Sequence, residues 1–549
     1  MTNEVVIKKG LKLGYLDAEA DLELLETCWI DNGQLNDILD LNSPTSVVLG
    51  RTGAGKSALL YKVSLEEKAE ILDPNNISIR FLEHSNIIQF FTEIGVKLDL
   101  FYRILWRHIL VVELLKLRYN LKNEGDNRNL LDRFRQWVGR DSLRKKALDY
   151  FTEWGDKFWL ETDEQLQELT NKFTCEVKNK LGTKFHDVDV SLEGARNLSE
   201  ERKAEIKSLA TQVVSQIQIQ RLTEVLNLLS QYAFCDKQKR FYILIDKLDE
   251  DWAETETRCR FIRALIEETK SMRNIPQVKI ITALRRDLLD LIFDKTRDSG
   301  FQQEKYEAYM VQLMWGRNEL RELLERRIQE VYKKQYTSDA VRLADVFPNP
   351  KKGDEVDPID YILDRTLLRP RDAIQFANEC FTAAAAAAAD TSRIPWTAIN
   401  TAEANYSMKR LKSLNEEWSE YYPALELTVE VLRGICTPFT RSTLSSNKIQ
   451  DISVELHDAD IKDPVVKVSR SQYEANAKNN ESDLINSILM CLYHVGVIGI
   501  KISTLSTFVW SHTDQPRISK SESKRANQIK VHEMYQHALE VFDKDRYSI

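Results

Sequence analysis

Glycine and proline are scarce in this sequence, which has 18 Gly and 12 Pro among its 549 residues. In globular proteins glycine usually makes up about 7% of residues and proline about 5%, and both shares are higher than in this chain. Because both residues mark tight turns, their scarcity argues against collagen-like chains, flexible linkers and all-β folds with many turns. Charged residues make up 30% of the chain, and these features together predict a helix-rich protein.

Cysteine pairs and long apolar runs are also lacking. The seven cysteines are scattered and include no C-x-x-C pair, so we expect reduced thiols and neither a disulfide framework nor a zinc site. The first ten residues lack the apolar segment of a signal peptide. No stretch approaches the roughly 18 apolar residues that a membrane span needs. These absences predict a cytoplasmic protein with no membrane partner.

The composition is otherwise that of an ordinary folded protein. Hydrophobic residues make up 43% of the chain, and 77 Lys and Arg against 85 Asp and Glu give a net charge of −8. This balance does not suggest a protein coated in nucleic acid, although it allows a local basic patch. At roughly 150 residues per domain, the length predicts two to four domains.

Short apolar runs alternate with helical patterns over residues 1–315. Strands are predicted at 46–49, 77–82, 241–245, 278–283 and 309–313, because continuous β-branched runs of this length are typical of buried parallel sheets. The long helical pattern at about 83–235 interrupts this rhythm. We therefore predict an α/β domain with a parallel sheet and a large helical insertion.

The rest of the chain is predicted to form two further regions. Residues 316–440 have a helical pattern and include seven consecutive alanines at 383–389, which favour a closely packed helix. Residues 441–481 are rich in Ser, Asn and Asp and are predicted to be a linker. An apolar helix at 483–495 precedes short strand-like pieces at 497–501, 507–510 and 528–531, which suggests a winged-helix-like module.

A Gly-rich motif follows the first predicted strand. Residues 50–57 read G-R-T-G-A-G-K-S and match the phosphate-binding pattern G-x-x-x-x-G-K-[ST], with a strand before it and a helix after it. Glycines let backbone N–H groups approach an oxyanion, the ammonium of Lys56 reaches the β- and γ-phosphates, and the Ser57 hydroxyl binds Mg²⁺. The residues predicted to bind ATP here are Gly50, Arg51, Thr52, Gly53, Ala54, Gly55, Lys56, Ser57 and Ala58.

Carboxylates follow the predicted strand at 241–245. In an open α/β sheet the residue after a central strand lies at the edge where ligands bind, so Asp246 is predicted to hold Mg²⁺ together with Ser57. Either Asp249 or Glu250 could polarise the attacking water, and the sequence leaves this choice open.

The string D-K-L-D-E-D-W at 246–252 resembles the Walker B segment of a family of prokaryotic P-loop ATPases. That family is related to the STAND and origin-recognition-like branches of the AAA (ASCE) ATPases. Three more strings fit the resemblance: D-A-E at 17–19, A-L-R-R-D at 283–287 and R-P-R-D at 369–372, and Trp315 fits as well. The resemblance implies a P-loop core, a helical lid and ATP with Mg²⁺ as ligands.

The resemblance also implies roles for four arginines. Arg285 and Arg286 follow a predicted sheet strand, at a position where they would sense phosphate or reach a neighbouring subunit. Arg369 and Arg371 flank a proline at a helix start in the lid, from where either would contact phosphate. An arginine that stabilises the transferring phosphoryl group can raise the rate by several orders of magnitude.

These observations predict a Mg²⁺-dependent ATPase that acts as a switch, controlling oligomerisation and a partner effector encoded nearby. The resemblance links such proteins to anti-phage defence. One alternative is a DNA-engaged ATPase of the origin-recognition or loader type, for which the basic stretches at 128–146 and 520–530 are the candidate contacts. Another is a scaffold that binds ATP without hydrolysing it.

Overall fold

The structure is a computed structural model of the chain. It describes residues 5–73, 86–96, 98–121, 124–138, 149–150, 152–154, 164, 168, 170–172, 175, 179, 192–216, 218–249, 255–296, 304–335, 341–351, 355–388, 391–444, 446–459, 462–475, 481–514 and 517–544. The chain divides into two compact units. The sheet unit comprises Asp31–Arg51 and Gly55–Leu313, and the helical unit comprises Met1–Ile30, Thr52–Ala54 and Met314–Ile549.

The sheet unit is built on a parallel sheet. Among the described residues five strands pair in the order β2-β3-β4-β1-β5, and each pairing is parallel. The strands are β1 (Val47–Leu49), β2 (Lys68–Leu72), β3 (Phe241–Ile245), β4 (Val278–Leu284) and β5 (Met310–Gln312). Every residue of β1, β3 and β4 is buried, as expected for central strands covered on both faces. The predicted α/β fold with a parallel sheet is therefore confirmed.

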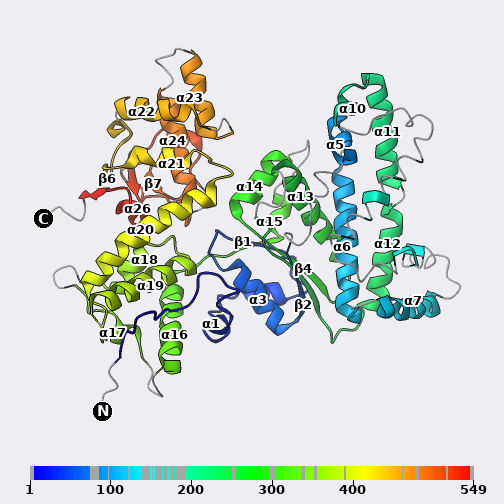
Figure 1. Cartoon of the computed structure of the whole chain (residues 1–549), viewed down its shortest axis with the longest axis horizontal. Helices are drawn as coiled ribbons and strands as arrows, with labels where there is room; N and C mark the ends of the chain where they lie inside the picture. Colours follow the sequence, from blue (N-terminus) through cyan, green and yellow to red (C-terminus); the bar gives the residue numbers. More distant parts are fainter. Residues whose placement is uncertain are drawn as a thin grey trace. The chain divides into compact units, whose positions relative to one another are not determined.

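Helices cover both faces of this sheet. The connection from β1 to β2 is α3, and that from β3 to β4 is α13, so the right-handed crossover rule puts them on opposite faces. Figure 1 shows this arrangement, with α14 beside α13. The helices of the unit are α2 (Gln34–Leu39), α3 (Lys56–Glu66), α5 (Asn86–Glu93), α6 (Asp99–Tyr119), α7 (Glu124–Val138), α10 (Leu192–Arg196), α11 (Glu200–Gln216), α12 (Gln218–Leu228), the π-helix η3 (Leu229–Ala233), α13 (Thr255–Met272), α14 (Arg286–Lys295) and α15 (Glu304–Glu307).

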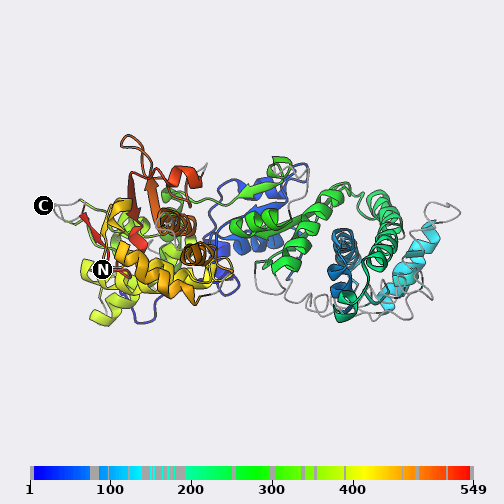
Figure 2. The same cartoon turned by 90° about the horizontal axis from the view of Figure 1, so that it is seen from above.

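The described residues between β2 and β3 are mostly helical, as predicted for the insertion. Its central helix α6 packs against α13 and contacts α11 and α12, and Figures 1 and 2 show these long helices side by side. Trp106 of α6 lies 4.6 Å from Phe261 of α13, ring centroid to ring centroid, and its indole N–H donates to the Phe261 carbonyl. The insertion therefore shares one hydrophobic core with the sheet.

The helical unit contains a separate hydrophobic core. Its largest helix contact joins α19 and α20, and the aromatic rings of Phe376 and Tyr406 stack between them at 4.6 Å. The helices of the unit are α1 (Leu22–Thr27), α16 (Arg317–Gln335), α17 (Leu343–Val346), α18 (Pro358–Asp364), α19 (Pro370–Ala387), α20 (Trp396–Trp418), α21 (Leu425–Val429), the 3₁₀ turns η4 (Glu430–Leu432) and η5 (Arg441–Thr443), α22 (Ser446–His457), α23 (Pro464–Ala475), α24 (Glu481–Val495), α25 (Lys520–Ser523) and α26 (Glu533–Gln536).

Two short strand pairs complete the helical unit. The antiparallel ribbon of β7 (Ile498–Lys501) and β8 (Gln528–Val531) follows α24, as the sequence predicts for the C-terminal module. The piece expected at 507–510 contributes an isolated bridge between Val509 and Ile500. The strands β6 (Cys436–Thr437) and β9 (Phe542–Asp543) form the second pair.

The structure differs from the expected elements at residues 441–481 and at the edge of the sheet. The linker predicted at 441–481 is wrong, because α22 and α23 occupy most of it and bury Ile449, Leu456 and Val466. The strand predicted at 77–82 lies outside the described residues. The edge strand β2, which pairs with β3, was not predicted from the sequence because most of its residues are exposed and two of them are charged.

The predicted α/β domain spans residues 1–315, but its N-terminal part belongs to the other unit. Residues 5–30 are part of the helical unit. Ile7 bridges Thr391 in an antiparallel pair, and Asp21 forms a buried ion pair with Arg327 at 2.6 Å. These long-range contacts leave no local pattern in the sequence.

Candidate functional site

The Gly-rich segment forms the turn between β1 and α3. Gly53 and Gly55 have φ values of +80° and +96°, in the left-handed region that side chains rarely adopt. Gly55 is the N-cap of α3, so the free N–H groups of the first helical turn follow it directly. Gly50 at the other end donates its N–H to the Leu284 carbonyl of β4 at 3.2 Å. The predicted strand–loop–helix context of this motif is thus present.

Lys56 is the first residue of α3 and is buried. Its ammonium donates to the carbonyls of Gly50 at 3.3 Å and Arg51 at 3.5 Å. It also lies 3.8 Å from a carboxylate oxygen of Asp249. The side chain is therefore folded back over the beginning of its own loop, where it leaves a positive charge next to a helix N-terminus. Both features favour an anion.

Asp246 and Ser57 lie together, although the sequence separates them widely. Asp246 directly follows β3 and is buried, and its carboxylate accepts a hydrogen bond from the N–H of Lys247 at 2.9 Å. Burial raises the pKa of Asp246, while the neighbouring Ser57 hydroxyl, the N–H of Lys247 and the charge of Lys56 oppose that rise. A buried carboxylate held in this way gains from a nearby cation.

Of the two carboxylates that could polarise the attacking water, the structure describes Asp249. Asp249 contacts Lys56 as stated above, whereas Glu250 lies outside the described residues. Lys247 has a φ of +57° and directs its ammonium to Asp73, 3.2 Å away at the end of β2. Asp73 was not among the predicted site residues, because it follows β2, whose charged and mostly exposed residues do not have the pattern of a buried strand.

The two arginines after β4 are both paired with carboxylates. Arg285 is the N-cap of α14 and donates to both oxygens of Asp287. Arg286 lies 3.3 Å from Asp290, one turn further along the helix. Arg285 follows Leu284, whose carbonyl holds Gly50, so its backbone is adjacent to the start of the Gly-rich segment.

The arginines predicted from the R-P-R-D string belong to the helical unit, as do residues 52–54 of the Gly-rich segment. Arg369 is buried, pairs with Asp372 at 2.8 Å and donates to the Thr52 carbonyl at 2.9 Å. Burial alone would lower the pKa of Arg369, but Asp372 and the neighbouring Glu417 raise it above its ordinary value.

Arg371 contacts the next residue of the segment. Its backbone N–H donates to the Gly53 carbonyl at 3.4 Å, and its guanidinium donates to the Leu16 carbonyl at 3.2 Å. Burial and the positive charge of Arg369 lower the pKa of Arg371. Both arginines therefore touch the Gly-rich segment, but through its carbonyl groups.

The predicted ligands fit a metal-bound triphosphate. Mg²⁺ is commonly held by one or two protein oxygens, with phosphate and water completing its shell, and the Ser57 and Asp246 oxygens provide such a pair. Within the described part of the chain, no group of three or more His, Cys, Asp or Glu side chains gathers into a metal site.

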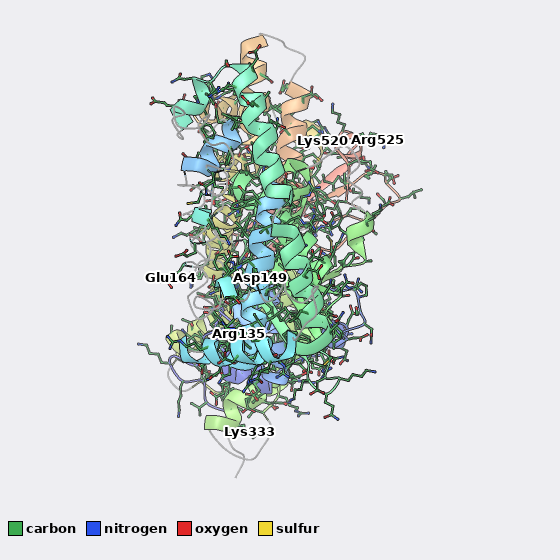
Figure 3. All side chains as sticks on the ribbon, turned by 90° about the vertical axis from the view of Figure 1, so that its right-hand side faces the viewer. Arg135, Asp149, Glu164, Lys333, Lys520 and Arg525 are labelled. Atoms are coloured by element: carbon green, nitrogen blue, oxygen red, sulfur yellow. The ribbon has the colours of Figure 1, made fainter. Side chains whose placement is uncertain are left out.

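The two candidate basic stretches contain both exposed and buried residues, and in the second one Lys530 is half-buried and pairs with Glu533 at 2.9 Å. Arg128, Arg133 and Arg135 lie on the solvent side of α7, and Figure 3 labels Arg135 there. Residues 139–146 of this stretch lie outside the described residues. In the helical unit Lys520 and Arg525 are exposed and labelled in Figure 3.

No described helix is both long and apolar enough to cross a membrane. The comparison with curated proteins found no match to this chain. A comparison with protein families matched residues 318–415 to the FunZ-associated C-terminal helical domain. The matched stretch begins in α16 and ends within α20, so the part of the chain predicted as a helical region after residue 316 is similar to a recognised helical domain.

Proposed function

We propose that the protein is a Mg²⁺-dependent ATPase. The observation that carries this proposal is the meeting of two separate motifs in the sheet unit. Lys56 and Ser57 begin α3 after a glycine with positive φ, and the Ser57 hydroxyl is near enough to the carboxylate of Asp246, at the end of β3, to lower its pKa. A helix N-terminus with a lysine binds phosphate, and a hydroxyl beside a carboxylate binds Mg²⁺.

Each residue would then have a defined part. The N–H groups of the loop and of the first turn of α3 hold the phosphate oxygens, and Lys56 turns from the carbonyls of Gly50 and Arg51 to the phosphate. Mg²⁺, when bound by Ser57 and Asp246, neutralises charge on the phosphate oxygens. Asp249 or Glu250 orients the attacking water, and Arg285 or Arg286 stabilises the negative charge that develops.

We further propose that the nucleotide state controls assembly with copies of itself and with a partner effector. The support for this step is the resemblance of the 246–252 and 369–372 strings to prokaryotic switch ATPases, whose members are linked to anti-phage defence. Mass photometry with a slowly hydrolysed ATP analogue tests it, because a switch of this kind changes its mass distribution between the ATP-bound and nucleotide-free states.

Substituting Lys56→Ala tests the ATPase proposal. We expect ATP affinity to fall at least ~10-fold and phosphate release to fall to background, since Lys56 is the cation nearest the predicted phosphates. The matched control is Lys62→Ala on the same helix, whose ammonium pairs with Glu66 at 3.1 Å. Isothermal titration and a phosphate-release assay measure both effects. Unchanged ATP binding and turnover in Lys56→Ala would refute the proposal.

A further inference from the structure

Three consecutive carbonyls of the Gly-rich segment accept hydrogen bonds from the helical unit to which these residues belong. The Thr52 carbonyl accepts from Arg369 Nη1 at 2.9 Å, the Gly53 carbonyl from the Arg371 N–H at 3.4 Å, and the Ala54 carbonyl from the Trp315 indole N–H at 2.8 Å. Each carbonyl thus has its own donor. Arg369 and Arg371 lie at the start of α19, and Trp315 lies two residues before α16.

The orientation of these carbonyls fixes the orientation of the N–H groups that follow. In a trans peptide the carbonyl of one residue and the N–H of the next point in opposite directions. When the carbonyls of residues 52–54 point to Arg369, Arg371 and Trp315, the N–H groups of residues 53–55 point away from them. Those three N–H groups belong to the segment that the P-loop pattern assigns to phosphate binding.

The donors are themselves held rigidly. The Arg369 guanidinium is buried between Asp372, at 2.8 Å, and Glu417, at 3.4 Å. Asp372 also lies 3.4 Å from Arg410 of α20, so α19 and α20 share a buried network of charges. An arginine held at several points presents its remaining donor in a fixed direction.

Close approach is possible because residue 53 is glycine. A Cβ atom at this position would lie 2.7 Å from the Cβ and 3.0 Å from the Cδ of Arg371. The 2.7 Å contact is shorter than real Cβ atoms make, so any side chain at position 53 would push the segment away from α19. The glycine therefore serves this contact as well as its positive φ.

We propose that Trp315 and Arg369 are positioning residues for the phosphate-binding segment, which they hold by its carbonyls so that its N–H groups present one anion cradle. This inference rests on the proposed function, and it gives Arg369 a different part from direct contact with phosphate. It also makes the affinity for nucleotide depend on Trp315 and Arg369, because the cradle forms only while their hydrogen bonds to residues 52–54 are made.

Trp315→Phe provides the cleanest test, because it removes the indole N–H and keeps an aromatic ring. The matched control is Trp396→Phe, whose indole N–H also donates to a backbone carbonyl of the helical unit, that of Asn349 at 3.0 Å. We expect Trp315→Phe to weaken the binding of ATP and ADP by about five- to tenfold, the usual effect of one hydrogen bond. Trp396→Phe should leave both affinities unchanged.

Hydrogen–deuterium exchange in the nucleotide-free protein separates this inference from the proposed function. A peptide covering residues 50–58 should exchange faster in Trp315→Phe than in the wild type, and at the wild-type rate in Trp396→Phe. The inference is overturned if exchange of this peptide is the same in all three proteins. If the wild type binds no ATP but the exchange difference is present, the proposed function fails and the positioning contact stands.

A second variant guards against a simple loss of folding. Arg369→Lys keeps the charge beside Asp372 but cannot reach the carbonyl and the carboxylate together. Its control is Arg365→Lys, a buried arginine of the same unit that pairs with Glu403 at 2.6 Å. With both proteins folded by circular dichroism, a loss of ADP affinity in Arg369→Lys alone supports the inference, and equal affinities refute it.

Discussion

The Ser57 hydroxyl lies beside the carboxylate of Asp246 and lowers its pKa, so the start of α3 adjoins the end of β3. In the sheet β4 lies between the strands that lead to these residues, so neither strand order nor sequence distance makes the contact obvious. A hydroxyl and a buried carboxylate at the carboxyl edge of a parallel sheet are suited to binding a divalent cation.

Substituting Asp246→Asn should increase stability and abolish activity. Burial raises the pKa of Asp246, so the folded protein binds the proton more tightly than the unfolded chain. The stability that this proton gives is present at acid pH and is lost as the pH rises through the raised pKa. We therefore expect the nucleotide-free variant to melt about 2–4 °C above the wild type near neutral pH, with the difference shrinking toward pH 4. Melting curves across this range measure it.

The control for this prediction is Asp132→Asn, an exposed carboxylate on α7 that pairs with Arg135 at 3.2 Å. Exposed ion pairs contribute little to the free energy of unfolding, so the melting temperature of Asp132→Asn should equal that of the wild type at every pH. A lower melting temperature for Asp246→Asn at neutral pH would show that the hydrogen bonds of Asp246 outweigh its burial.

Asp249→Asn and Glu250→Gln should behave differently from each other. Asp249 lies 3.8 Å from Lys56 and competes with phosphate for its charge, so Asp249→Asn should bind ATP as tightly as the wild type or up to about fivefold tighter. Whichever residue orients the water should lose turnover by at least ~100-fold while still binding ATP. Single-turnover hydrolysis measures this. Normal turnover in both variants would mean that another group orients the water.

Glu268→Gln should strongly destabilise the protein. Glu268 is fully buried in α13 and accepts from Arg103 and Arg107 of α6, each at 2.7 Å. Removing one partner of a buried ion pair leaves uncompensated charge and costs about 3–5 kcal/mol. Urea unfolding followed by circular dichroism measures this loss in the free energy of unfolding.

Its control is Glu256→Gln on the same helix, where the carboxylate is exposed and pairs with Arg260 at 2.9 Å. An exposed pair of this kind is worth about 0.3–0.5 kcal/mol. If both variants lost the same small amount, α6 would not depend on α13 through Glu268.

The sequence predicts most of the sheet because its central strands are continuous apolar runs. The run at 241–245 and the Gly-rich motif together predicted the positions of Asp246 and Ser57. The edge strand β2 was missed, since Lys68 and Glu70 interrupt its apolar pattern. Helices α22 and α23 were missed because Ser, Asn and Asp signal loops unless tertiary packing overrides them.

Contacts between distant helices could not be predicted in the same way. Arg369 was singled out by the R-P-R-D string, but nothing local indicates that it pairs with Glu417 of α20 and holds the Thr52 carbonyl. Such partners depend on how helices pack, and this information is spread over many side chains.

The membership of residues 5–30 in the helical unit governs how the protein can be divided. Ile7 and Leu13 are fully buried in that unit's core, and Asp21 neutralises the buried Arg327. A fragment beginning at residue 314 would therefore expose an apolar strip and leave a buried cation without its carboxylate, and it would aggregate. A soluble fragment of this half requires residues 5–30 to be supplied as well, either joined through a linker or added as a separate peptide.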